Sequence, residues 1–81
     1  MPVAIQVLSN PDGYPVSVSE TRNDRAALSK VKHVIDIWEL DDEWWRPTSI
    51  RRRYFRLLME TGRVMTVFRD LASDEWFRQE Y

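Results

Sequence analysis

The stretch RRYFRLLMETGRVMTVFRDL, residues 52–71, determines the fold class that we predict for this chain. Two runs rich in aromatic and branched side chains flank the sequence ETGR. Such runs favour β-strands, because these side chains pack well on a pleated, half-buried surface. Gly62 between them supplies the positive φ angle that a tight hairpin turn requires. The stretch therefore predicts an antiparallel hairpin with strands near residues 50–59 and 63–69.

The N-terminal residues predict a second hairpin of the same kind. A β-branched run near residues 3–8 ends at the turn sequence NPDG, and an alternating run follows near residues 14–19. In that turn Pro11 fixes φ, and Gly13 tolerates a positive φ. Pro15 lacks a backbone N–H, so the second strand is expected to lie at a sheet edge or to begin late.

Two further strands and one loop complete the pattern. The sequence KVKHVIDIWEL alternates and predicts a strand near residues 31–40, and WFRQEY predicts a short final strand near residues 75–80. The segment ETRNDRAALSK, residues 20–30, is polar and only weakly periodic. It is expected to be a connecting loop with one helical turn capped by Asn23 or Asp24.

Together these signals predict a single all-β domain over residues 1–81, either a small, strongly bent antiparallel sheet or a partly open barrel of five to six short strands. A hydrophobic fraction of 43% with four Trp is typical of a folded domain. The absence of cysteine excludes disulfides, Cys-type zinc sites and thiol catalysis. The N-terminal run MPVAIQVL lacks a basic flank and is too short for a signal peptide or a membrane span, so we expect a cytoplasmic protein without membrane contact.

Charge is nearly balanced overall but uneven along the chain. The formal net charge of −1 gives no general attraction to nucleic acid or membrane. Five acids and no base lie between Asp36 and Glu43, and five arginines without an acid lie between Arg46 and Arg56. Only these two local patches can therefore indicate a partner.

The residue types needed for catalysis or metal binding do not form a recognisable pattern. Asp41 and Asp42 are adjacent, so in an extended segment they point to opposite faces and cannot share one site. His33 is the only histidine, and no serine lies in a nucleophile-elbow sequence. With only two glycines there is no phosphate-binding glycine loop. We therefore assign no catalytic residue, metal ligand or cofactor, and expect a protein that is not an enzyme.

The basic and aromatic sequence IRRRYFR, residues 50–56, has two interpretations. Alternation divides it into two faces: Arg51, Arg53 and Phe55 against Arg52, Tyr54 and Arg56. Either face resembles the cationic stacking platform with which small barrels bind single-stranded nucleic acid. Alternatively the rings belong to the core and the arginine stems cover their rims. The core interpretation is favoured, and any binding of nucleic acid is expected to be weak and sensitive to salt.

The tryptophans point to a protein interface. Trp44 and Trp45 are adjacent, so they divide between core and surface unless a bulge intervenes. A core of this size would have difficulty enclosing every ring of four Trp, three Tyr and three Phe. At least one ring is therefore expected on an exposed patch of the kind that binds proteins. The candidate interaction surface comprises Trp44, Trp45, Arg46, Arg51, Arg53, Tyr54, Phe55 and Arg56.

Residues 38–81, WELDDEWWRPTSIRRRYFRLLMETGRVMTVFRDLASDEWFRQEY, resemble a small bacterial family of unknown function, and NPDGYPVSV is similar to that family's first hairpin. The matching positions are Trp38, Asp41, Asp42, Trp44, Trp45, Arg53, Tyr54, Gly62, Arg69, Asp70, Leu71, Trp76 and Tyr81. Members of the family are often encoded beside, or fused to, polymerase-like proteins of the Y family, which serve damage-tolerant DNA synthesis. The resemblance implies an accessory module for a DNA-repair or translesion-synthesis protein, and it implies no active site. Self-association through an unpaired edge strand or an aromatic patch remains a further expectation.

Overall fold

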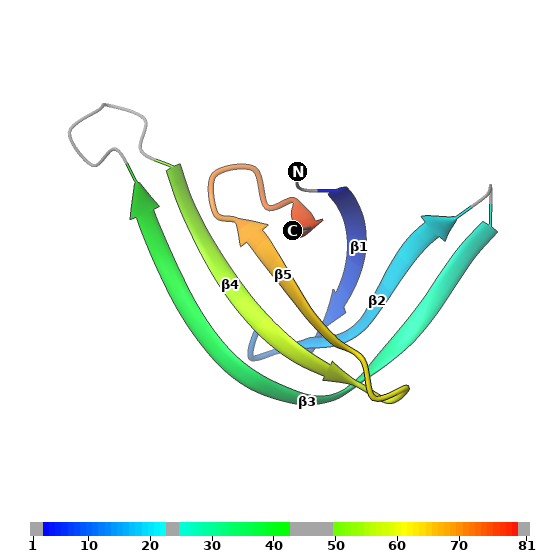
Figure 1. Ribbon diagram of the computed structural model, residues 1–81. Coiled ribbons are helices and arrows are strands. Elements are labelled where there is room, and N and C mark those ends of the chain that lie inside the picture. The colour runs from blue at the N-terminus through cyan, green and yellow to red at the C-terminus, as the bar shows by residue number, and fades with distance from the viewer. Residues whose placement is uncertain (1–2, 23–24, 43–49, 80–81) are drawn as a thin grey trace.

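The computed structural model describes residues 3–22, 25–42 and 50–79 of this chain, and within them it contains strands and no helix (Figure 1). The strands are β1 Val3–Ser9, β2 Pro15–Arg22, β3 Arg25–Asp42, β4 Ile50–Met59, β5 Val64–Asp70 and β6 Trp76–Arg78. Every pairing is antiparallel, and the strands follow chain order around a closed barrel. The prediction of a small all-β barrel is thus confirmed.

Strands β1 and β3 each pair with one strand over the first part of their length and with a different strand over the rest. This exchange of partners curves the sheet around the barrel interior. In β3, residues 25–30 pair with β2, and residues 31–42 pair with β4. In β1, residues 3–5 pair with β6, and residues 6–9 pair with β2. The ladder between β1 and β6 closes the barrel and places Val3–Ile5 beside Trp76–Arg78 (Figure 1).

The hairpin around Gly62 forms as predicted. Gly62 has a φ of 91°, and its N–H donates to the carbonyl of Met59 at 2.9 Å. Met59 N–H in turn donates to the carbonyl of Arg63 at 2.8 Å. These bonds close the turn between β4 and β5, whose registered pairs run from Leu58 and Val64 outward.

The NPDG turn between β1 and β2 also forms. Gly13 has a φ of 88°, and the side-chain oxygen of Asn10 accepts hydrogen bonds from Asp12 N at 3.0 Å and Tyr14 N at 2.9 Å. Pro15 is the first residue of β2, so this strand begins late, as the missing N–H predicts.

The expected loop over residues 20–30 is wrong. Strand β2 continues to Arg22 and β3 begins at Arg25, with cross-strand pairs from Ser17 and Lys30 to Arg22 and Arg25. The extended conformation is stabilised because each strand satisfies the backbone hydrogen-bonding groups of the other, which outweighs the weak local propensity. Asn23 and Asp24, the expected capping residues, lie outside the described residues.

The barrel interior is filled by alternate residues of the central strands. The buried core residues are Val18, Phe55, Leu57, Met59, Met65 and Val67. From β3, Val31 and Val34 both pack against this core, although strict alternation places them on opposite faces. The reason is a bulge: the register with β4 shifts between Val31 and His33, so Lys32 is an extra residue. A second shift lies between Val34 and Asp36.

Candidate interaction surface

The residues expected on the interaction surface occupy different environments. Phe55 is in the barrel core with 2% of its surface exposed, and Tyr54 is 8% exposed. Arg51 and Arg56 are exposed, whereas Arg53 is half-buried. Trp44, Trp45 and Arg46 lie outside the described residues. The exposed members that the structure describes are therefore cations of β4 rather than aromatic rings.

Four rings form a ladder on the outer face of the barrel, one each from β3, β4, β5 and β6. Trp38, Tyr54, Phe68 and Phe77 are successive cross-strand neighbours, with ring centroids 5.4, 5.0 and 5.2 Å apart. Their chain neighbours Phe55 and Val67 point into the core, so this ladder is a separate aromatic layer. Phe68 at its centre is only 1% exposed.

Two arginines of β4 cover this ladder. The guanidinium carbon of Arg52 lies 4.7 Å from the ring centroid of Phe68, and that of Arg56 lies 5.6 Å from the centroid of Trp38. These are cation–π distances, at which the positive charge is attracted to the ring face. The arginines therefore cover rings that are already packed, which agrees with the core interpretation of IRRRYFR.

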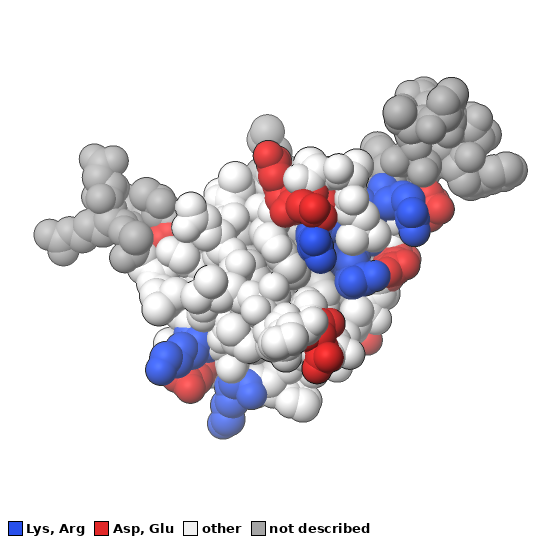
Figure 2. Space-filling view, turned by 180° about the vertical axis from the view of Figure 1, so that it is seen from behind, with Lys and Arg blue, Asp and Glu red and all other residues white. Residues whose placement is uncertain are grey.

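The acidic and basic runs of the sequence meet across the β3–β4 ladder. Its register places Asp36 opposite Arg56, Glu39 opposite Arg53 and Asp41 opposite Arg51. Arg53 and Glu39 form an ion pair at 2.7 Å. Seen from behind, the surface shows basic and acidic side chains interleaved rather than one continuous basic area (Figure 2). Each run therefore reduces the field of the other.

A concave surface with a volume of about 980 Å³ runs along β1. Its lining residues, which define the β1 groove, are Ala4, Ile5, Gln6, Val7, Leu8, Ser17, Ser19, Leu28, Asp74, Glu75 and Trp76. Leu8 is 65% exposed and Leu28 is 63% exposed, which makes them the two most exposed large hydrophobic residues that the structure describes. The β1 groove therefore combines apolar side chains with hydroxyl, amide and carboxylate groups.

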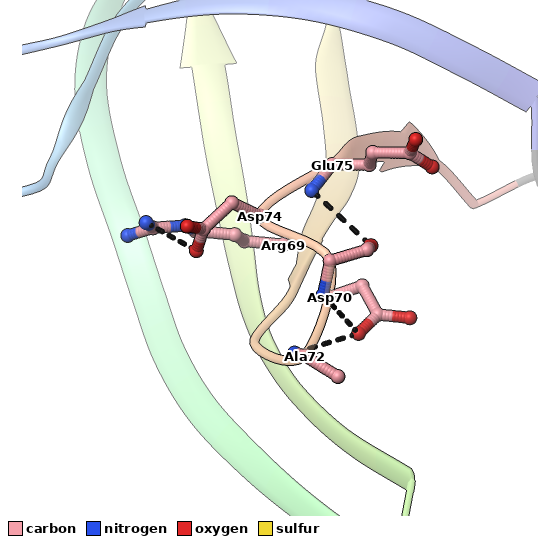
Figure 3. Close-up of polar contacts among 6 residues, drawn as sticks. Arg69, Asp70, Ala72, Asp74 and Glu75 are labelled. Carbon is pink, nitrogen blue, oxygen red and sulfur yellow. Dashed lines mark hydrogen bonds and ion pairs between the residues drawn. The ribbon is translucent and has the colours of Figure 1, made fainter.

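The turn between β5 and β6, whose polar contacts are shown in Figure 3, contributes Asp74 and Glu75 to the lining of the β1 groove. Asp70 organises this turn, because its Oδ1 accepts the N–H of Ala72 at 2.9 Å and its backbone N–H donates to the carbonyl of Glu75 at 2.8 Å. Asp74 has a φ of 61°, and its carboxylate accepts a hydrogen bond from Arg69 at 2.7 Å. The contact with Arg69 fixes the carboxylate of Asp74, which lines the β1 groove.

Sequence reasoning missed the β1 groove because Leu28 lies in the segment expected to be a loop. The pairing of Ser19 with Leu28, and of Ser19 with Gln6, brings three strands together at this surface. The dipeptide Asn23–Asp24 is a turn signal that could have indicated the hairpin and hence the position of Leu28.

Within the described ranges, no three His, Asp or Glu side chains gather in a way that could hold a metal ion. The same part of the chain contains no helix that is both long and apolar enough to cross a membrane. No protein-family model, curated protein or solved structure gives a significant match to this chain.

Proposed function

We propose that this chain is a non-enzymatic protein-interaction module that binds a protein partner through the β1 groove. The observation that carries the proposal is the position of Leu8 and Leu28. These residues are distant in sequence and highly exposed, yet both line one groove. Gathered exposed apolar side chains are typical of protein-binding surfaces, because covering them removes apolar area from water.

The side chains that line the β1 groove indicate which residue types a partner segment would carry. Complete burial of a leucine side chain stabilises a complex by roughly 1.5–3 kcal/mol, so Leu8 and Leu28 could act as anchors for apolar partner side chains. The carboxylate of Asp74 is already paired with Arg69, so it is the carboxylate of Glu75 in this groove that favours a basic residue beside those anchors. The partner segment is therefore expected to be apolar with an adjacent Lys or Arg.

The proposed partner class comes from the family resemblance. We place the module in the bacterial cytoplasm as an accessory of a polymerase-like or other DNA-repair protein. Residues 44–46, together with the exposed arginines Arg51 and Arg56, are a second contact region in this proposal. Binding of single-stranded nucleic acid is less well supported, because the described rings of the Arg–aromatic stretch are buried and its arginines face acids.

The proposal is tested by affinity capture from a bacterium that encodes the chain beside a polymerase-like protein, with mass spectrometry to quantify recovery. We expect a polymerase-like or repair protein with the natural chain, and at least a tenfold lower recovery with Leu8→Lys or Leu28→Lys. Val64→Lys is the matched control, since Val64 is 56% exposed on β5 and outside the β1 groove. Recovery that is unchanged in both leucine variants, or recovery of unrelated metabolic enzymes only, would contradict the proposal.

A further inference from the structure

Strand β3 has an edge that no described strand covers. Its residues 31–42 pair with β4 on one side, while the pairing with β2 on the other side ends at Lys30. Along this edge lies a groove of about 580 Å³ that we name the β3 edge groove. Seven consecutive residues, 31–37, line it, so side chains of both faces and the strand edge between them border the groove. Tyr14, which precedes β2, and Val16 of β2 also line the groove.

The β3 edge groove carries a strip of exposed apolar side chains. Tyr14, Val16, Ile35 and Ile37 are 43%, 45%, 46% and 39% exposed, respectively. Isolated apolar residues on a surface are ordinary, but four that line one groove form a continuous patch that association would cover. The groove thus provides both a strand edge and apolar anchors, which are the two requirements for adding a strand from another chain.

The order of charges along this edge identifies the occupant. Lys32 lies at one end of the apolar pair Ile35 and Ile37, Asp36 lies between the two isoleucines, and Glu39 and Asp41 lie beyond the other end. An antiparallel copy of the same strand presents this order reversed, so its acidic end meets the basic end of the first copy. We infer that the β3 edge groove is a self-association surface at which two copies of this chain pair antiparallel about a two-fold axis near Ile37.

Two features of β3 limit this pairing to a closed dimer of modest affinity. The bulges at Lys32 and Ile35 interrupt the regular edge, and Asp36 Oδ1 accepts the N–H of Ile37 at 2.9 Å. Both devices reduce the number of backbone groups that can form an intermolecular ladder. Packing of the isoleucines therefore contributes most of the association. A two-fold arrangement uses the same edge in both copies, so it ends at two chains.

This inference goes beyond the proposed function and uses other residues. The β1 groove shares no residue with the β3 edge groove, so each can be disabled separately. Leu8→Lys should reduce partner recovery and leave self-association unchanged. Ile35→Lys should weaken self-association and leave partner recovery unchanged. Failure of one proposal is therefore distinguishable from failure of the other.

The first test is sedimentation equilibrium of the full chain from about 10 μM to about 1 mM, a range that detects weak dimers. We expect a monomer–dimer equilibrium whose dissociation constant rises at least tenfold in Ile35→Lys and Ile37→Lys. Val64→Lys adds the same charge outside both grooves and should match the natural chain. A natural chain that stays monomeric throughout, or isoleucine variants that dimerise normally, would overturn the inference, as would loss of dimerisation in Leu8→Lys.

The second test examines the antiparallel order of charges. Lys32→Glu and Asp41→Lys each bring like charges together in the dimer, so each should weaken dimerisation severalfold. The double variant restores opposite charges between copies and should recover most of the natural affinity. Circular dichroism melts establish that each variant is folded. Recovery in the double variant supports the two-fold pairing, and additive weakening would overturn it.

Discussion

Two ion pairs of similar length show how the surroundings determine the contribution of one residue. Arg78 and Glu20 meet at 2.7 Å with side chains that are 17% and 13% exposed. Arg53 and Glu39 also meet at 2.7 Å, but their side chains are 38% and 49% exposed. Water screens the attraction within the exposed Arg53–Glu39 pair more strongly than that within the Arg78–Glu20 pair. Loss of charge should therefore reduce stability more at Glu20 than at Glu39.

We therefore expect Glu20→Gln to lower the free energy of unfolding by about 1–3 kcal/mol, because it removes the charge of one partner from a mostly buried ion pair. Glu39→Gln is the matched control and should lower it by no more than about 0.5 kcal/mol. Urea denaturation followed by tryptophan fluorescence measures both values. Equal losses in the two variants would show that burial does not distinguish the pairs.

Gly62 gives a second prediction at this scale. A Cβ placed there meets no atom within 4 Å, so its φ of 91° is the only obstacle to a side chain. Gly62→Val should lower the free energy of unfolding by roughly 1 kcal/mol or more, because a β-branched residue resists positive φ. Gly62→Asn, which tolerates this conformation better, should lose less. A melting temperature unchanged by valine would contradict the turn geometry.

Among the elements, β3 shows what the sequence could and could not predict. Both glycine-containing turns were predictable, because a glycine in a turn sequence indicates a position with positive φ and the strands beside it alternate clearly. The start of β3 was not, because residues 25–30 are held by cross-strand pairing rather than by their own propensity. The bulges at Lys32 and Ile35 were also not predicted from the sequence. Each bulge moves the side chains that follow it to the opposite face of the strand. Consequently neither groove could be predicted. Phe55 was named for the candidate interaction surface, but it is buried, as the favoured core interpretation of IRRRYFR has it.

The same element predicts uneven local stability. Among the described strands, residues 25–29 of β3 pair with β2 alone, and Leu28 there is 63% exposed, whereas Leu57 in β4 is fully buried between two paired strands. Backbone amides of residues 26–29 should therefore exchange with deuterium at least tenfold faster than amides of residues 55–58, because the former open without breaching the core. Exchange followed by NMR measures this. Uniform rates would instead mean that the barrel opens as one unit.

At the scale of the whole molecule, the acidic and basic runs neutralise each other across β3 and β4. Arg51, Arg53 and Arg56 each face a carboxylate in register, and the net charge is −1. Binding to phosphate backbones depends on unopposed cations that release counterions. The molecule as a whole therefore offers little attraction for nucleic acid.

We accordingly expect no change in tryptophan fluorescence when a short single-stranded oligonucleotide is added at physiological salt, and at most weak binding at low salt. The variant Glu39→Gln is a useful comparison, because removing one opposing carboxylate should strengthen the low-salt signal. Tight binding that survives physiological salt and disappears in Tyr54→Ala would overturn this expectation and favour the stacking alternative.

The ladder that joins β1 to β6 has a consequence for the rate of folding. Val3 and Arg78 are cross-strand neighbours, so their pairing closes a loop of almost the entire chain. The entropy cost of such a closure is on the order of 4 kcal/mol, which local hairpins do not incur. The Gly62 hairpin should therefore form before the seam, and seam closure should limit the rate. Joining the two ends covalently through a short flexible linker would remove most of that cost in advance. In stopped-flow refolding, the circular chain should fold at least tenfold faster than the linear one, with a nearly unchanged unfolding rate.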